Sequence, residues 1–306
     1  MNVRMLLFVV LLSVSPFSGR CAAIDVLFPA YANPCCDGGP LMWSSLIETA
    51  RDRRRMFELH VIFNPASGPG IERDPNYVDA SGNGPLKDLK SAGGIIHGYV
   101  GTRYGTRPLE DIKADVDAYF TGHYAGFVDG IFFDEMSNDL ANTGYYAELQ
   151  DYVKSLQATA RTFGNPGTPY TENPSGQTEF TAEDYIDSLD TIITIENTDA
   201  VYMTEYRSFP YLEDLHPHKI GHIIHSRKTW DAGLLKLAAE RGAGFLYVTD
   251  DVMPPNDNPY DAIPGYWGQF TSDVSSFNKS EFRKPPSRRG RGRDGKRRES
   301  RGERRR

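Results

Sequence analysis

The chain has 306 residues, of which 39% are hydrophobic and 12% aromatic, enough apolar material for a full core. Its formal charge of -7 divides into +10 for Arg283–Arg306, which holds 13 Lys/Arg and three Asp/Glu, and -17 for the remainder. An acidic body does not suit a domain that binds a polyanion, so any affinity for nucleic acid would belong to the tail.

The N-terminus has the features of a secretory signal peptide, expected to span residues 1–23. Arg4 supplies a positive charge, Met5–Val14 is a largely apolar stretch, and Cys21–Ala23 offers small residues for cleavage. This stretch is too short to cross a bilayer, which takes roughly 20 residues, and no later stretch is long and apolar enough. We therefore expect a secreted protein, the alternatives being a retained anchor or a buried first strand.

The cysteines are Cys21, Cys35 and Cys36. Cys21 is expected to leave with the signal peptide, and neighbouring cysteines rarely bridge to each other because the geometry is strained. We expect two unbridged thiols in a loop or, as an alternative, an intermolecular disulfide. Three cysteines exclude a zinc site built from four thiolates.

Eight short apolar runs, each bounded by Gly, Pro, Asn or Asp, have the pattern of buried strands. They are Ile24–Pro29, Leu59–Asn64, Gly94–Val100, Asp129–Asp134, Thr162–Pro166, Thr191–Glu196, Lys219–His225 and Gly244–Thr249. Helical spacing occupies stretches between them, namely Leu41–Met56, Pro108–Tyr119, Leu140–Phe163, Tyr202–Leu212 and Trp230–Arg241.

Strands that alternate with helices predict an α/β fold with parallel pairing and right-handed crossovers. Eight repeats over residues 24–270 match a single (β/α)8 TIM-type barrel, which takes roughly 250 residues. The alternative is an open doubly wound sheet. No Gly-x-Gly-x-x-Gly follows the first strand, which argues against a dinucleotide-binding version of that sheet.

Residues 271–306 are expected to form a tail that is first polar and then rich in Arg, without large apolar residues in its second part. Such a segment cannot bury a core and is expected to be disordered. Its cations would suit an acidic wall polymer, a membrane surface or nucleic acid, the alternative being no partner. Asn278–Ser280 is a glycosylation sequon.

The carboxyl ends of the strands are where barrels of this kind hold their active sites. Two carboxylates across one pocket are the minimum for glycoside hydrolysis, since one protonates the leaving oxygen while the other attacks or activates water. Asp134, Glu135 and Glu196 stand at such ends and are the candidate catalytic residues. Adjacent strand residues point to opposite faces, so Asp134 and Glu135 are not equivalent unless the strand breaks there. Alternatively, both acids cap the following helix.

Substrate-binding candidates are polar or aromatic residues at or beyond the strand ends, since aromatic faces suit the apolar C–H faces of sugars. They are Asn64, Tyr99, Tyr104, Arg107, Asn165, His225, Asp250, Tyr260 and Trp267, with Tyr31, Tyr145 and Tyr170 also available. His60, His97, His222 and His225 lack the spacing of metal ligands, so we expect core or supporting roles, with no metal and no cofactor. The absence of Gly-x-Ser-x-Gly argues against an α/β-hydrolase.

Six motifs in order resemble the spherulin-4 family over roughly Ile24 to Trp267. They are Ile62–Gly70, Gly98–Arg107, Val128–Glu135, Asn165–Thr168, Glu196, and Asn258–Tyr260 with Tyr266–Trp267. The resemblance implies a (β/α) barrel grouped with glycoside hydrolase family 135, whose characterised fungal members are endo-acting enzymes that cleave galactosaminogalactan, a polysaccharide containing N-acetylgalactosamine.

The same resemblance implies that Asp134, Glu135 and Glu196 match the acidic residues needed for activity. By analogy with related barrel hydrolases, Asp134 would be the nucleophile, Glu196 the acid/base, and Glu135 a supporting residue. We expect a secreted, monomeric, metal-independent hydrolase of a hexosamine-containing polysaccharide. The alternative is a non-catalytic carbohydrate-binding or cell-wall protein on the same barrel. An apparent insertion at Asn173–Glu179 leaves the specificity open.

Overall fold

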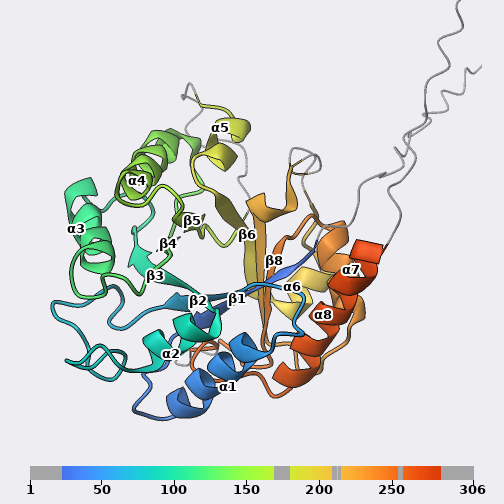
Figure 1. Ribbon diagram of the computed structural model, residues 1–306. Helices are drawn as coiled ribbons and strands as arrows, with labels where there is room; N and C mark the ends of the chain where they lie inside the picture. The colour runs from blue at the N-terminus through green and yellow to red at the C-terminus, as the bar shows by residue number, and fades with distance from the viewer. Residues whose placement is uncertain (1–22, 169–179, 209–211, 213–214, 254–257, 284–306) are drawn as a thin grey trace, which may run out of the picture.

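Eight parallel strands close into a barrel in sequence order, and helices surround it (Figure 1). This computed structural model describes residues 23–168, 180–208, 212, 215–253 and 258–283. Each strand pairs with the next, and β8 returns to pair with β1. The predicted (β/α)8 TIM-type barrel is therefore confirmed, and the open doubly wound sheet is excluded.

All eight predicted strands are present, with ends that shift by a few residues. They are β1 (Asp25–Ala30), β2 (Leu59–Phe63), β3 (Ile95–Gly101), β4 (Gly130–Asp134), β5 (Arg161–Gly164), β6 (Thr191–Thr198), β7 (Ile220–His225) and β8 (Phe245–Val248). The apolar runs are strands because both faces are covered: β1, β2, β7 and β8 are buried at every position.

The helices are less regular than the strands. They are α1 (Gly39–Arg51), α2 (Pro85–Ala92), α3 (Leu109–Phe120), α4 (Thr143–Leu156), α5 (Ala182–Asp187), α6 (Asp199–Thr204), α7 (Gly233–Glu240) and α8 (Trp267–Arg283), with 3-10 turns η1 (Leu140–Asn142) and η3 (Pro217–Lys219). The helix expected over Leu140–Phe163 ends at Leu156, which frees Arg161–Gly164 to pair as β5. The helix expected at Tyr202–Leu212 begins earlier, as α6.

Aromatic rings fill the barrel interior near the amino ends of its strands. His60 stacks on His97 at 5.1 Å between ring centroids, while Phe163 and Phe245 close the group with contacts of 4.8 to 5.0 Å. Both histidines are at most 3% exposed, as expected of core residues. The histidines expected in the core therefore lie there.

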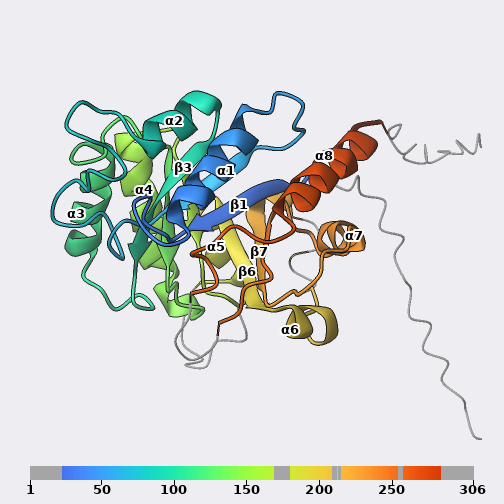
Figure 2. The same ribbon diagram turned by 90° about the horizontal axis from the view of Figure 1, so that it is seen from below.

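The polar stretch expected to begin the tail at residue 271 instead belongs to α8. Phe270 and Val274 are fully buried, and the Trp267 indole donates to Thr49 Oγ1 of α1 at 2.9 Å. Both views show α8 beside α1 on the outside of the barrel (Figures 1 and 2). Phe270 and Val274 are four residues apart and so lie on one face of a helix. The average composition of this segment is polar and does not reveal that face. The expected disordered region 284–306 lies outside the described residues.

Asn278 ties α8 to the start of the barrel. Its side chain is fully buried, accepts from Ile24 N at 2.9 Å, and donates to the Ile24 and Met56 carbonyls at 2.9 and 2.7 Å. These contacts occupy both ends of the amide. A buried, fully bonded amide cannot carry a glycan in the folded protein. The role of Asn278 is therefore to hold α8 against the start of the barrel.

We expect Asn278→Ala to destabilise the protein by about 2–4 kcal/mol, because it leaves buried backbone groups of Ile24 without partners. The thermal midpoint should fall by roughly 5–15 °C. Ser280→Ala is the matched control: it destroys the same sequon but removes only an exposed hydroxyl that donates to Phe277 O. Equal midpoints for the two variants would contradict this role of Asn278.

Cys35 and Cys36 form a disulfide with each other in the loop after β1, so the expectation of unbridged thiols is wrong. A tight turn brings the two sulfurs together: Asn33 accepts from both cysteine backbone N–H groups, at 3.1 and 3.2 Å. Asp37, the next residue, has a left-handed backbone with φ 50°. The disulfide therefore closes an exposed turn at the carboxyl end of the barrel.

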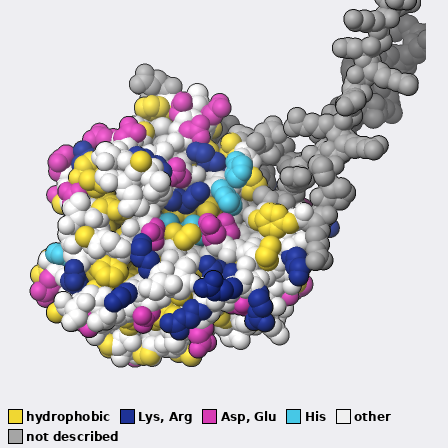
Figure 3. All heavy atoms as spheres, viewed as in Figure 1, with side chains coloured by type: hydrophobic (Ala, Val, Ile, Leu, Met, Phe, Trp, Pro, Cys, Tyr) yellow, Lys and Arg dark blue, Asp and Glu magenta, His cyan; other side chains and the backbone are white. Residues whose placement is uncertain are grey.

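Basic side chains gather over the lower part of the view in Figure 3, around α1 and α2. Arg51, Arg53, Arg54 and Arg55 contribute four cations at the end of α1.

No helix among the described residues is long and apolar enough to cross a membrane. The expected signal peptide at residues 1–23 lies almost wholly outside the described residues.

Candidate active site

The ends of β4, β5 and β6 bring two carboxylates to one amide. Asn165 follows β5 and is buried, and its Nδ2 donates to Asp134 Oδ1 at 2.8 Å and to Glu196 Oε2 at 2.5 Å. The two carboxylate oxygens are therefore no farther apart than the sum of these distances. Asn165 is itself fixed, because its Oδ1 accepts from Gly167 N at 3.0 Å.

Glu196 is held at both of its carboxylate oxygens. Besides the bond from Asn165 to Oε2, the Tyr260 hydroxyl donates to Oε1. A register shift between Ile193 and Ile195 interrupts the β6–β7 pairing just before this residue. Such irregularities redirect side chains near functional sites. Together the two bonds fix the orientation of the Glu196 carboxylate.

Asp134 has a pKa raised to about 6, chiefly by burial and then by the neighbouring charge of Glu196. Hydrogen bonds from Tyr99 and Asn165 oppose the rise without cancelling it. A carboxylate this close disfavours the charged form of Asp134. At and below this pKa Asp134 keeps its proton, so the site places a proton donor beside a second carboxyl group, which is the equipment for acid-assisted displacement.

The strand breaks at Glu135, whose backbone is left-handed with φ 50°. Thr102 fixes this turn, since its hydroxyl donates to the Asp134 and Glu135 carbonyls at 3.0 and 2.8 Å. A Cβ placed on Gly101 would lie 3.7 Å from Glu135 Oε2 and 3.8 Å from the Tyr99 hydroxyl. Because strand alternation ends here, Glu135 turns its carboxylate toward the Tyr99 side of the site.

Three tyrosines stand next to the carboxylates. Tyr31 packs edge-on against Tyr99 and Tyr260, with ring centroids 5.6 Å apart in both pairs. The charges of Asp134 and Glu196 help to raise the pKa of Tyr31, although burial is the largest cause. These rings come from the β1 loop, β3 and the β8 loop. They form an aromatic wall beside the two carboxylates.

Two of the predicted binding residues have other partners. The Arg107 guanidinium pairs with Asp115 at 2.6 Å and donates to Gly101 O, so it holds the β3 loop. Asn64 Oδ1 accepts from Gly68 N at 3.0 Å and shapes the β2 loop. Each of these two side chains therefore has a structural role.

The remaining predicted binding residues have partners of their own or face solvent. Asp250 accepts from Gly265 N at 3.1 Å, and the buried His225 bonds Ser226 Oγ at 2.9 Å through Nδ1. Trp267 packs against Phe28 and Thr49, outside the carboxylate group. Tyr104 is 63% exposed on a left-handed turn, open to solvent. Tyr170 and Asn173–Glu179 lie outside the described residues.

The fold and this site define a (β/α)8 barrel protein with a hydrogen-bonded carboxylate pair at the carboxyl ends of β4 and β6. The chain belongs to spherulation-specific family 4, whose sequence profile matches residues 25–274. The match confirms the family resemblance and extends it into α8.

Two relatives place the chain more closely. It is 26% identical to spherulin-4 of Physarum polycephalum over 263 residues, which cover 83% of this chain and 71% of that protein. It is similar in structure to the crystal structure of Aspergillus clavatus Sph3 in complex with GalNAc, with a TM-score of 0.62 and 24% identity. That match covers 83% of this chain and 98% of Sph3, and it supports the barrel fold.

Proposed function

We propose that this protein is a glycoside hydrolase that cleaves a polysaccharide containing N-acetylhexosamine, with Asp134 and Glu196 as its catalytic pair. The observation that carries this proposal is the single amide of Asn165 that donates to both carboxylates. The neutral amide of Asn165 holds the two acids together, and the pKa of Asp134 is raised. This arrangement suits a reaction that needs an acid and a base side by side.

The spacing of the pair favours retention of configuration. The two distances from Asn165 Nδ2, 2.8 and 2.5 Å, limit the separation of the facing oxygens to their sum. Retaining glycosidases hold their carboxyl groups about 5–5.5 Å apart, whereas inverting enzymes need about 6.5–9.5 Å to admit a water molecule. A double displacement through a glycosyl–enzyme intermediate fits the shorter spacing.

Burial and the neighbouring charge favour Asp134 as the acid and leave Glu196 as the nucleophile, the reverse of the division that the family resemblance implies. Glu196 accepts from Tyr260 and Asn165 at its two oxygens, which holds its carboxylate in one orientation. Burial and the charge of Glu196 keep a proton on Asp134 up to a pKa of about 6. The group with the raised pKa is the natural proton donor.

The reaction then has two steps. Asp134 gives its proton to the glycosidic oxygen while Glu196 attacks the anomeric carbon, so the leaving sugar departs as an alcohol and a glycosyl ester forms. Ionised Asp134 next takes a proton from water, whose oxygen attacks the same carbon and releases Glu196 as a carboxylate. Asp134 ends protonated, as it began.

The substrate class rests on the relatives and the aromatic wall. The Sph3 complex contains GalNAc, and Tyr31, Tyr99 and Tyr260 present ring edges and faces beside the carboxylates. We propose that these tyrosines, with exposed Tyr104, contact the sugar, and that Glu135 binds a hydroxyl or amide group of it. Secretion, proposed from the N-terminal sequence, would bring the enzyme to an extracellular polysaccharide.

The decisive experiment is to incubate the full chain with galactosaminogalactan and follow polymer length by size exclusion and new reducing ends by colorimetry. We expect chains to shorten and reducing ends to accumulate, with midchain cleavage producing oligosaccharides early. A protein that binds the polymer without changing its length would instead be a carbohydrate-binding member of the family, and the hydrolase proposal would fail.

A further inference from the structure

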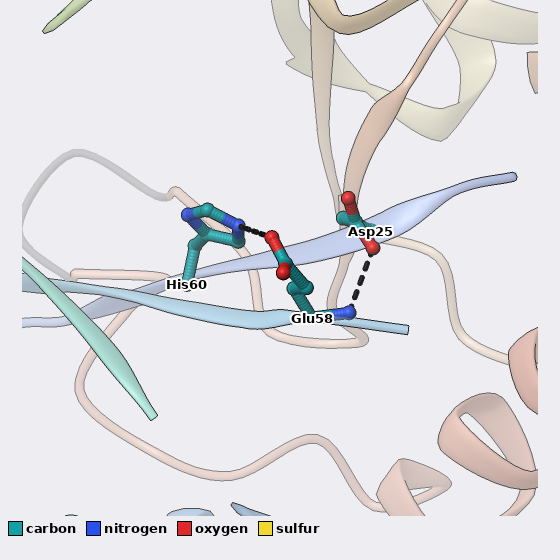
Figure 4. A group of neighbouring side chains, drawn as sticks. All are labelled: Asp25, Glu58 and His60. Atoms are coloured by element: carbon teal, nitrogen blue, oxygen red, sulfur yellow. Dashed lines mark hydrogen bonds and ion pairs between the residues drawn. The ribbon is translucent and has the colours of Figure 1, made fainter. Parts of the chain in front are cut away.

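Three potential metal ligands meet at the amino end of the barrel, opposite the carboxylate pair. Asp25 begins β1, Glu58 directly precedes β2, and His60 lies within β2 (Figure 4). One ligand atom from each lies within 4.8 Å of the others. Asp25 and His60 are buried while Glu58 is exposed, so an ion can enter from solvent and Glu58 can close over it.

His60 Nε2 points into this group, where it makes a long ion pair with Glu58. The residue is 3% exposed, and its Nε2 is a buried nitrogen that no hydrogen bond satisfies. Glu58 Oε2 lies 3.4 Å away (Figure 4). On the other side of the ring, Nδ1 is 2.8 Å from His97 Nε2. A proton on Nδ1 would donate to His97 and leave a lone pair on Nε2 facing the carboxylates, as metal-binding histidines require.

Two of the separations match the edge length of a tetrahedral site. Bonds of about 2.0–2.1 Å to nitrogen and oxygen place tetrahedral ligands about 3.3–3.5 Å apart. His60 Nε2 and Glu58 Oε2 are 3.4 Å apart, and Asp25 Oδ2 is 3.2 Å from His218 Nε2. His218 precedes β7 and is one-third exposed at its side chain. Asp25 belongs to the second of these pairs and also lies within 4.8 Å of the ligand atoms of Glu58 and His60.

We propose that Asp25, Glu58 and His60 bind one divalent transition-metal ion, with His218 as the adjacent fourth donor. Imidazole nitrogen with carboxylate oxygen suits Zn²⁺ better than Ca²⁺ or Mg²⁺, which prefer oxygen ligands alone. This proposal departs from the expectation of a core or supporting role, without a metal, for His60. The ligands come from separate strands, so no linear spacing such as His-x-x-x-His announces them.

The site would stabilise the closure of the barrel. β8 and β1 pair through only two residue pairs, Asp25 with Phe245 and Val26 with Leu246. Asp25 stands at this short seam, and an ion bound to it would join β1 to the start of β2 and, through His218, to β7. Groups at the amino end of such barrels serve stability, whereas catalysis occurs at the other end. The inference is therefore independent of the proposed hydrolase activity.

The cation nearest in the fold has partners of its own. The Arg161 guanidinium donates to Thr191 Oγ1 at 3.0 Å and lies over the Phe245 ring. Those contacts hold it on the β5 side of this group.

The test uses the full, untagged chain, stripped with chelator and titrated with Zn²⁺ in a calorimeter. We expect one ion per chain and a rise of roughly 5 °C or more in the thermal midpoint when free Zn²⁺ exceeds the dissociation constant about 100-fold. Co²⁺ should give the visible absorption of a tetrahedral complex. Native mass spectrometry counts the bound ions.

Glu58→Gln removes one ligand from an exposed position, so the fold should survive. We expect its affinity for Zn²⁺ to fall at least about 100-fold, since even outer-shell partners contribute about 10- to 100-fold. Glu240→Gln, an exposed glutamate on α7, is the matched control and should bind as the parent does. A parent chain that takes up no Zn²⁺ or Co²⁺, or a Glu58→Gln variant that binds them as tightly as the parent, would overturn the proposal.

Discussion

Asp134→Asn and Glu196→Gln are each expected to lower kcat on the polysaccharide by at least about 10³-fold, or about 4 kcal/mol of transition-state stabilisation. Each change keeps the shape of the side chain and its bond to Asn165 while removing the proton donor or the nucleophile. Steady-state release of reducing ends measures the loss. Thermal midpoints close to that of the parent would show that the fold survives.

Two substitutions of the same chemistry serve as controls. Asp139→Asn changes an acid five residues beyond Asp134 that caps η1, a position where Asn also accepts from a backbone N–H. Glu205→Gln changes an exposed glutamate that follows α6. Both should keep activity within about twofold of the parent. Full activity in Asp134→Asn and Glu196→Gln would remove the catalytic assignment altogether.

The division of roles has its own readout. An aryl glycoside with an acidic leaving group needs no proton from the enzyme, so Asp134→Asn should recover much of its first-step rate on that substrate. Glu196→Gln should stay inactive, because the nucleophile is missing for every leaving group. The opposite pattern would restore the assignment of Asp134 as nucleophile.

Asn165→Ala is expected to lower kcat about 10²- to 10³-fold, the usual effect of losing one preorganised donor. It should also shift the pH profile. The Asn165 hydrogen bond lowers the pKa of Asp134, so its loss raises that pKa above about 6. Activity that depends on protonated Asp134 falls as pH rises through this pKa. The basic limb of kcat/KM should therefore move to higher pH in Asn165→Ala.

Asn142→Ala provides the comparison for Asn165→Ala, because its amide donates to Ser137 Oγ rather than to a carboxylate. It should leave the position of the basic limb unchanged. A purely structural role for Asn165 would lower activity at all pH values alike. An unshifted limb in Asn165→Ala would therefore contradict the account of how this amide tunes the pair.

The strands were predictable because parallel strands that are buried on both faces have nearly continuous apolar sequences. Strand order then brought Asp134, Asn165 and Glu196 to the same edge, since the carboxyl ends of parallel strands meet there. This part of the site needs only local pattern and topology. The confirmed family membership is consistent with it.

The turn at Glu135 could not be read from the sequence. Strand alternation alone separates Asp134 from Glu135, but Thr102 bonds carbonyls 32 and 33 positions away and fixes a left-handed residue that ends the strand. Such strain persists only where surrounding contacts impose it. The contacts of Thr102 exist only once β3 pairs with β4.

The burial of apolar residues within a mostly polar segment was also hard to predict. The segment after Trp267 is polar on average, yet Phe270 and Val274 share one helical face with Asn278, and that face packs on the barrel. Likewise, the residue types of Trp267 and Arg107 suit sugar binding, but α1 and Asp115 occupy them. Residue type predicts what a side chain can do, whereas packing decides which partner it has.

Proton NMR of the first products from an N-acetylgalactosamine polymer of defined linkage tests the central claim most directly. The close Asp134–Glu196 pair predicts that each new reducing end first appears with the anomeric configuration of the bond that was broken. Mutarotation should then produce the other anomer. Products that first appear with the inverted configuration, or a polymer that yields no new reducing ends, would contradict the account.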